Sequence, residues 1–360
     1  MRHIAQGCPS FGGNERAYVN DCLETGWLTS GHWVERFEKT FADYIGVKHA
    51  VATKSGTAAL HLSLAALGIG PGDEVIVPAL TFVATANAVS YTGAKPVIAD
   101  VDPDTWLMDW KYAGGADAYL PVSLFGVPTE TSPTVVGHPV IDDACEALGA
   151  RVGSMKTGQL GRAACFSFYG NKTITTGEGG MVTTNDNALA ARMRHMRSEC
   201  TDKEKRFYHD GIGFNYVMTD IQGALGCAQM EALRGILEWR AEVAAQYRKR
   251  LGGAVTFQRT PDGCTHGNWA MGVLMPEGVD REVVRAQLKE GGIETRPFFY
   301  PLNTLPMYKG PSCPVAESVA ARGILLPMHA ELNPDDVDYV CDELLKVLEH
   351  EASRASLNVA

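Results

Sequence analysis

Several features that would assign a protein to a class at once are missing from this chain of 360 residues. Its nine cysteines show no C-x-x-C spacing, so the sequence indicates neither a zinc site nor a disulfide framework. The N-terminus lacks the basic start, apolar stretch and cleavage site of a signal peptide, and no run of about 18 apolar residues could span a membrane. We therefore expect no metal, no membrane partner and a cytoplasmic location.

An excess of basic residues is also missing, because 32 Lys and Arg stand against 42 Asp and Glu, a formal charge of −10. This balance argues against general nucleic-acid binding, which needs a basic face. No G-x-G-x-x-G motif follows the first predicted strand, which disfavours a nicotinamide-dependent reductase. The chain does have a hydrophobic content of 45%, enough for a large core divided between two domains.

Apolar strands and helical patterns alternate from about residue 48 to residue 185, which predicts an α/β sheet covered by helices. Thr219 then precedes a long helical pattern that we expect to link two domains. A strand over 268–275 and two further helical stretches, the second begun by Asn333 and Pro334, indicate a smaller α+β domain. We predict a large domain over residues 1–240 and a small C-terminal domain over residues 241–360.

One lysine, Lys172, lies among small, polar and glycine residues directly after an apolar run over residues 163–168. The run predicts a buried strand, and the loop that leaves such a strand is where α/β enzymes place their chemistry. A desolvated lysine amine can form a Schiff base with an aldehyde, and pyridoxal 5'-phosphate (PLP) is the obvious aldehyde. Ser167, just before this loop, has a hydroxyl that could bond a phosphate. Taken alone, such a lysine is more often a solvated surface residue.

Two adjacent acids, Asp142 and Asp143, follow a short apolar strand after Pro139. An acid at a strand end can bind a metal, cap the next helix or hold a pyridinium nitrogen protonated, which lets PLP act as an electron sink. Successive strand residues face opposite sides, so only one of the two acids can point at a given ligand.

The stretch Ser55, Gly56 and Thr57 precedes a helix rich in alanine and leucine. Free backbone N–H groups and the helix dipole make such a helix start suitable for a phosphate. Plain N-capping by Ser55 is the simpler interpretation of these three residues alone.

Phosphate cradle, acid and lysine, in this order, resemble the DegT-type sugar aminotransferases, a family of PLP-dependent enzymes of fold type I. The resemblance covers nearly the whole chain, and its longest continuous part is residues 168–181. It implies an aspartate aminotransferase-like α/β fold, in which the large domain has a mixed, mostly parallel sheet flanked by helices. A smaller α+β domain would follow at the C-terminus.

The same resemblance implies roles for individual residues. Lys172 matches the Schiff-base lysine, Asp143 the partner of the pyridinium nitrogen, and Phe82 the ring stacked on PLP. Asn215 matches an asparagine that reaches the phosphate from the neighbouring subunit, which implies a homodimer with shared active sites. Glu146 stands where the family often has an acid or amide near the cofactor. The implied phosphate contacts are Ser55, Gly56, Thr57 and Ser167.

Substrate contacts are expected on the other side of the cleft, and the candidates are Trp27, Ser30, Arg296 and Tyr300. The guanidinium of Arg296 could bind a carboxylate or diphosphate through its planar fork, or form a structural ion pair. Ser123 and Asn303 stand where many relatives carry histidine, and Val217 where arginine is frequent. These departures leave the implied cofactor set intact and bear on the identity of the sugar and nucleotide.

The resemblance implies transfer of an amino group from L-glutamate to the 4-keto group of a nucleotide-linked 4-keto-6-deoxy sugar, with PLP cycling through pyridoxamine 5'-phosphate. GDP-4-keto-6-deoxy-D-mannose is the first substrate that it suggests, and a dTDP- or UDP-linked keto sugar is the alternative. A sugar dehydratase is disfavoured, because such relatives carry histidine where Lys172 stands. A PLP-binding regulator without turnover is the rival from another class.

Overall fold

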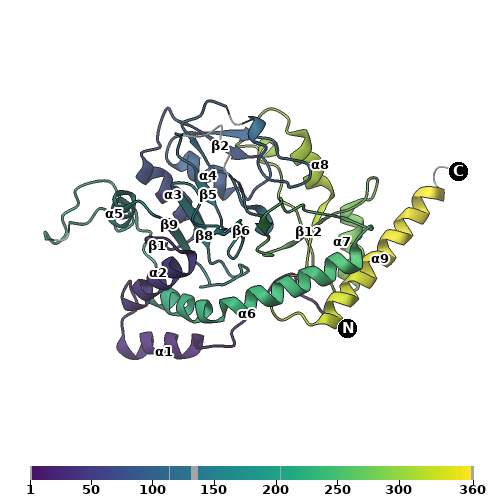
Figure 1. Ribbon diagram of the computed structural model, residues 1–360, viewed down its shortest axis with the longest axis horizontal. Coiled ribbons are helices and arrows are strands. Elements are labelled where there is room, and N and C mark those ends of the chain that lie inside the picture. Colours follow the sequence, from purple (N-terminus) through teal and green to yellow (C-terminus); the bar gives the residue numbers. More distant parts are fainter. Residues whose placement is uncertain (1, 113, 131–136, 203, 358–360) are drawn as a thin grey trace.

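The computed structural model describes residues 2–112, 114–130, 137–202 and 204–357 (Figure 1). Seven strands form the central sheet of the larger unit, and two parallel bridges, Tyr119 to Val140 and Val122 to Asp143, join its two halves. In spatial order the strands are β1 (His49–Thr53), β9 (Gly180–Thr184), β8 (Ala163–Ser167), β5 (Ile141–Asp143), β4 (Ala118–Tyr119), β2 (Glu74–Pro78) and β3 (Lys95–Ala99).

Strand direction in this sheet is mixed and mostly parallel. β9 is antiparallel to both of its neighbours, β1 and β8, whereas the β5–β8, β2–β4 and β2–β3 pairs are parallel. β1, β2, β8 and β9 have consecutive buried residues and are therefore buried on both faces, as expected for strands covered on both sides, whereas β3 at the edge is only partly buried. The predicted strand over 163–168 is confirmed as β8.

Successive strand residues point to opposite sides of the sheet, so apolar side chains stand on both faces. Helices cover each face and bury these side chains in two separate cores. Ala50, Ala52 and Phe166 pack with α2 and α6, whereas Val51 and Cys165 pack with α3, α4 and α5. The helices of this unit are α1 (Glu15–Thr25), α2 (His32–Ile45), α3 (Gly56–Leu67), α4 (Ala84–Tyr91), α5 (Asn187–Met196) and α6 (Asp220–Leu251).

The long helix α6 begins where the sequence predicts. Thr219 and Gln222 form a reciprocal capping box, which satisfies backbone N–H groups at the helix start. Leu233 lies in the core of the larger unit, whereas Val243 and Tyr247, further along α6, lie in the core of the C-terminal unit. The helix therefore runs along both units (Figure 1) and crosses residue 240, so the predicted domain division stays a prediction.

The C-terminal unit is an antiparallel sheet with helices against it. α7 and α9 share one core with this sheet, and α8 packs on its other side against residues of the larger unit. The strands in order are β10 (Thr256–Phe257), β12 (Met271–Leu274), β14 (Gly323–Leu326) and β13 (Arg296–Pro297), and the helices are α7 (Arg281–Glu290), α8 (Pro314–Arg322) and α9 (Pro334–Leu357).

The strand predicted over 268–275 is shorter in the structure. Asn268 has a φ of 50°, outside the extended region, and β12 begins only at Met271. The remaining elements are a small sheet of β6 (Arg151–Val152), β7 (Met155–Lys156) and β11 (Cys264–Thr265), and the 3-10 turns η1 (Trp110–Tyr112), η2 (Leu124–Gly126) and η4 (Leu302–Thr304). Among the described residues, no helix is both long and apolar enough to cross a membrane.

Candidate active site

A cavity of about 490 Å³ opens where the larger unit meets the C-terminal unit. The last residues of β5 and β8 and the first residues of α3 and α4 line it, together with Arg296 and Trp269 from the C-terminal half of the chain. This is the position that open α/β sheets use for ligands, beyond the carboxyl ends of their strands. Nine of the predicted site residues line the cavity: Ser55, Gly56, Thr57, Phe82, Asp143, Glu146, Ser167, Lys172 and Arg296.

The start of α3 forms one end of the cavity. Ser55 is its N-cap, and its hydroxyl oxygen accepts a hydrogen bond from the backbone N–H of Ala58 at 3.1 Å. Within the described part of the chain, the backbone N–H groups of Gly56 and Thr57 have no acceptor. A Cβ on Gly56 would lie 2.8 Å from the Cβ of Ser167, so only glycine allows this approach. The two free N–H donors, together with the hydroxyls of Ser55 and Thr57, lie at a helix N-terminus and therefore suit an anion.

Asp143 is the acid that faces the cavity. Its side chain is buried, and it accepts hydrogen bonds from the Thr85 hydroxyl at 2.8 Å and from the backbone N–H of Cys145 at 3.2 Å. Burial raises the pKa of the Asp143 carboxyl, and the positive charge of Lys172 partly opposes that rise. A cationic ring nitrogen placed beside it would favour the ionised carboxylate for the same electrostatic reason.

Asp142 points to the other side of the strand, as the alternation of side chains requires. The hydroxyl of Ser123 donates to its Oδ1 at 2.9 Å, whereas its Oδ2 is buried and has no hydrogen-bond partner among the described residues. Burial raises the pKa of Asp142 to about 7. It is not among the residues that line the cavity.

Lys172 lies in the turn after β8, and its amine faces two partners. Its Nζ is 3.3 Å from Oε1 of Glu146 and 3.8 Å from the centre of the Trp269 ring. The hydroxyl of Thr175 donates to the carbonyl of Phe168, which closes this turn against the strand end. The side chain of Lys172 is only 13% exposed, so the lysine is not the solvated surface residue of the simpler interpretation.

Glu146 is held on both sides. Its Oε2 accepts a hydrogen bond from the backbone N–H of Phe125 at 3.0 Å, and its Oε1 accepts from Lys172. Burial raises the pKa of Glu146, while the charge of Lys172 acts to lower it. The carboxylate therefore orients the lysine amine at the floor of the cavity.

Large side chains form the outer edge of the cavity. The Phe82 ring is 55% exposed, and its centre lies 5.7 Å from that of the Phe299 ring. Tyr169 is similarly exposed, and Arg296 at the start of β13 completes this edge. An exposed aromatic face at a cavity mouth is suited to stacking on a flat ligand.

Four predicted site residues do not line the cavity of a single chain: Trp27, Ser30, Asn215 and Tyr300. Trp27 is exposed and donates a hydrogen bond from its Nε1 to the carbonyl of Ser30 at 3.2 Å. Asn215 is exposed and pairs with Ser198 in an antiparallel bridge, and Tyr300 is 66% exposed.

Several residues that line the cavity were not predicted, among them Trp269, Thr85, Cys145 and Tyr169. Trp269 contacts the Lys172 amine and also donates from its Nε1 to the carbonyl of Asn171 at 2.9 Å, yet nothing in the sequence connects residues so far apart. Thr85 bonds Asp143, and its place in the stretch 81–87 of the family resemblance was a usable signal. The side chain of Cys145 also lines the cavity, and burial raises the pKa of its thiol well above the usual value, so it stays protonated.

Comparisons with known proteins agree with this geometry. The model of the DegT/DnrJ/EryC1/StrS aminotransferase family matches residues 9–345. A GDP-perosamine synthase of Caulobacter vibrioides is 44% identical over 97% of this chain and 99% of the relative. A second, from Escherichia coli O157:H7, is 40% identical over 96% of this chain and 98% of the relative.

Solved structures agree on the fold. A Streptococcus pneumoniae protein in its pyridoxamine phosphate (PMP) form superposes with a TM-score of 0.92 at 25% identity, and the match covers 99% of this chain and all of that chain. The predicted fold class is therefore confirmed, and so is the prediction of an aminotransferase. On the length of the family match and the identity to full-length relatives, this chain belongs to the DegT/DnrJ/EryC1/StrS aminotransferase family.

Proposed function

We propose that this chain transfers an amino group from L-glutamate to the C4 keto group of GDP-4-keto-6-deoxy-D-mannose, and so makes GDP-perosamine. The observation that carries the proposal is the 44% identity, over 97% of this chain, to a relative of that named activity. Identity at that level along the whole length supports the same reaction class, and the cavity supplies the groups that aminotransfer needs.

The cavity also supports PLP as the cofactor, because the residues present fit its parts. Gly56, Thr57 and Ser167 surround a place for the phosphate, Asp143 is a buried acid for the ring nitrogen, and Lys172 offers the amine. Phe82 has a free aromatic face for the ring. When bound, PLP accepts electron density from the carbon that loses its proton.

Lys172 would hold the cofactor and then act as the proton carrier. Its amine would take the proton from the α-carbon of glutamate and later deliver one to C4 of the sugar. Glu146, at 3.3 Å, accepts from this amine and so fixes its direction. The ring centre of Trp269 lies 3.8 Å from the same amine, and the Lys172 side chain is only 13% exposed, so little water would reach it.

The homodimer with shared sites is part of the same proposal. Asn215 does not line the cavity of its own chain, and it lies beside a segment that projects from the body next to α5 (Figure 1). From this position Asn215 would contact the cofactor phosphate in the cavity of a second copy of the chain, not in its own. Tyr300 and Trp27 are exposed in the single chain, and in such a dimer they would be free to contact the substrate at a shared site.

The activity is tested with purified protein, PLP, L-glutamate and one nucleotide-linked keto sugar at a time. We expect 2-oxoglutarate and GDP-perosamine in equal amounts from the GDP sugar, detected by mass spectrometry. Turnover of a dTDP- or UDP-linked keto sugar in its place would change the substrate and keep the aminotransferase. Absence of 2-oxoglutarate with every sugar would favour a PLP-binding regulator.

Shared sites are tested by mixing two variants that we expect to be inactive on their own, Lys172→Ala and Asn215→Ala. In a mixed dimer one site would receive Lys172 from one chain and Asn215 from the other, so it would be intact. Random mixing in equal amounts gives half mixed dimers with one intact site each, so about a quarter of the native activity should return. No recovery after confirmed subunit exchange would place Asn215 in its own chain's site.

A further inference from the structure

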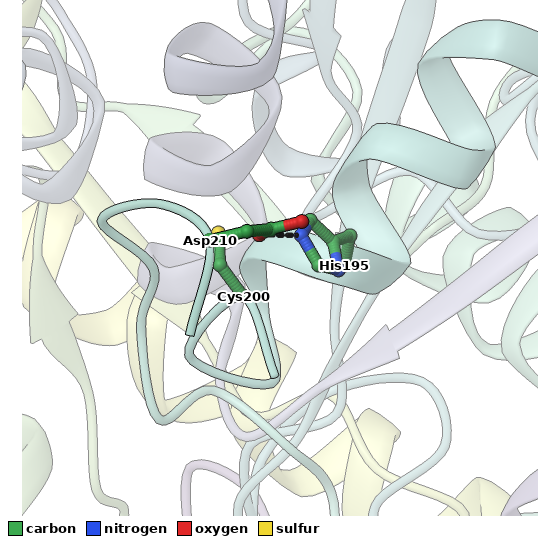
Figure 2. A group of neighbouring side chains, drawn as sticks. All are labelled: His195, Cys200 and Asp210. Atoms are coloured by element: carbon green, nitrogen blue, oxygen red, sulfur yellow. Dashed lines mark hydrogen bonds and ion pairs between the residues drawn. The ribbon is translucent and has the colours of Figure 1, made fainter. Parts of the chain in front are cut away.

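Three side chains with different donor atoms meet at the end of α5, away from the cavity. His195 lies in the last turn of α5, and Cys200 and Asp210 lie on the segment that follows (Figure 2). One nitrogen of His195, the Sγ of Cys200 and one oxygen of Asp210 all lie within 4.8 Å of one another. None of the three lines the cavity, so the aminotransfer reaction does not explain the group.

The backbone at this place is held in an unusual conformation. Glu199 and Cys200, which are not glycines, both have positive φ, at 58° and 50°. Such residues cost on the order of 1–3 kcal/mol each and persist only where the surroundings enforce them. The backbone N–H of Cys200 donates to the carbonyl of His195 at 3.1 Å, and that of Asp210 donates to the carbonyl of Cys200 at 3.2 Å. These bonds bring the three side chains together.

The three donors differ in their exposure to solvent, in a way that would let a metal ion enter. Cys200 is 4% exposed, whereas the side chains of His195 and Asp210 are 37% and 50% exposed. The thiol therefore lies at the back of the group, and the imidazole and carboxylate leave an open path from solvent. A metal ion entering along that path would meet all three donors and keep one position for water.

We propose that His195, Cys200 and Asp210 bind a Zn²⁺ ion, with water as the fourth ligand. Sulfur, imidazole nitrogen and carboxylate oxygen together suit this ion, which takes four ligands in a tetrahedron. His195 and Asp210 now share a hydrogen bond of 2.6 Å, whereas ligands on one tetrahedral zinc ion lie about 3.3 Å apart, so a small side-chain rotation admits the ion. The thiol proton of Cys200 passes to solvent when the Zn–S bond forms.

The site would have a structural effect rather than a part in the reaction. The antiparallel bridge from Ser198 to Asn215 and the bond from the Glu199 N–H to the Phe214 carbonyl lie at the base of the same segment. Zinc would add a cross-link across that base, at the point where the segment leaves the body (Figure 1). Asn215 would thereby be tied to the end of α5.

The test uses the full-length protein, reduced and freed of metal by a chelator, with Co²⁺ as the optical probe and Zn²⁺ as the competitor. We expect one Co²⁺ per chain, a thiolate-to-cobalt absorption band, long-wavelength tetrahedral d–d bands, and loss of all of these when one equivalent of Zn²⁺ is added. Zn²⁺ should also raise the melting temperature of the native chain, because it binds the folded state.

Matched variants decide the result. Cys200→Ser should abolish the thiolate band and weaken Zn²⁺ binding by at least about 10-fold, whereas Cys264→Ser, a half-buried cysteine in β11, should change neither. If Cys200→Ser does not fold, His195→Asn at a partly exposed position makes the same test. Absence of stoichiometric binding by the native chain, or binding that Cys200→Ser leaves intact, would overturn the proposal.

Discussion

The floor and the rim of the cavity differ in how far a single chain completes them. We call Asp143, Glu146 and Lys172 the floor, and Phe82, Tyr169 and Arg296 the rim. The two floor acids are 5% and 6% exposed and have bonded partners, whereas Phe82 and Tyr169 are 55% and 51% exposed. Large exposed apolar groups beside a cavity mark a surface that meets a ligand or another chain.

The difference shows that the floor of the site is preorganised in the single chain, whereas the rim is not. Charged groups at the floor are fixed by hydrogen bonds in a desolvated place, so they need no rearrangement when the reaction begins. The aromatic groups at the rim keep large exposed surfaces in the single chain, which would be covered on binding. Substitutions at the floor should therefore act mainly on turnover, and substitutions at the rim mainly on affinity.

The largest effect should follow from Lys172→Ala, because the proposed proton carrier and cofactor anchor is lost. We expect the turnover number for GDP-perosamine formation to fall by about 10⁴-fold or more, with thermal unfolding little changed. Lys39→Ala, an exposed lysine paired with Asp43 on α2, is the control and should keep its activity. Native turnover by Lys172→Ala would remove the lysine from the mechanism.

The two neighbouring acids give the next comparison. Asp143→Asn keeps the shape but loses the charge opposite the proposed ring nitrogen, so turnover should fall by about 10³-fold. Asp142→Asn, one residue away and outside the cavity, should change turnover by no more than about threefold, because it touches none of the reacting groups. Steady-state assays at saturating glutamate measure both. Equal losses in the two variants would contradict the assignment of Asp143.

Asp142 also predicts a dependence of stability on pH. Its pKa of about 7 in the folded chain lies above the ordinary 3.8, so its favourable effect is full below pH 4 and is lost as the pH rises through 7. Asp142→Asn removes this loss. Relative to native, the variant should gain up to about 4 kcal/mol of unfolding free energy between pH 4 and pH 8. Denaturant unfolding of both proteins at each pH measures the gain, and parallel curves would refute it.

A smaller effect is expected where floor and rim meet, at Trp269. Trp269→Leu removes the ring 3.8 Å from the lysine amine, a contact worth about 1–2 kcal/mol, so turnover should fall by about 10-fold. Trp269→Phe keeps a ring but loses the hydrogen bond to the Asn171 carbonyl, and it should recover part of the loss. If Phe and Leu behave alike, the ring face does not act on the lysine.

The smallest effect should come from the rim residue Phe82. Phe82→Leu loses the proposed stacking on the cofactor, worth about 0.5–1.5 kcal/mol, so the dissociation constant for PLP should rise by about 3- to 10-fold. Turnover at saturating PLP should change little. A large loss of turnover with unchanged PLP affinity would break the division between floor and rim.

Local sequence patterns predicted much of the fold because short-range forces decide those features. The apolar run before Lys172 is β8, Thr219 caps α6, and the start of α9 follows Asn333, as their patterns indicate. The predicted bounds of one strand were wrong, because the backbone there does not follow the extended conformation that the apolar pattern suggests. The strand expected from Asn268 begins at Met271, because Asn268 turns out of the extended region.

The sequence by itself predicted the fold class and the family, through a resemblance along nearly the whole chain, and both are confirmed. It also predicted the lysine, the acid at the strand end and the helix start that we propose for the cofactor, because each stands in a short pattern of neighbouring residues. Only the tertiary structure decided that Glu146 and Trp269 enclose the amine of Lys172. For the two acids it agrees with the family resemblance, because Asp143 lines the cavity and Asp142 does not. It alone also brought His195, Cys200 and Asp210 together. Contacts between distant residues follow from the packing of helices and strands, which no local pattern encodes.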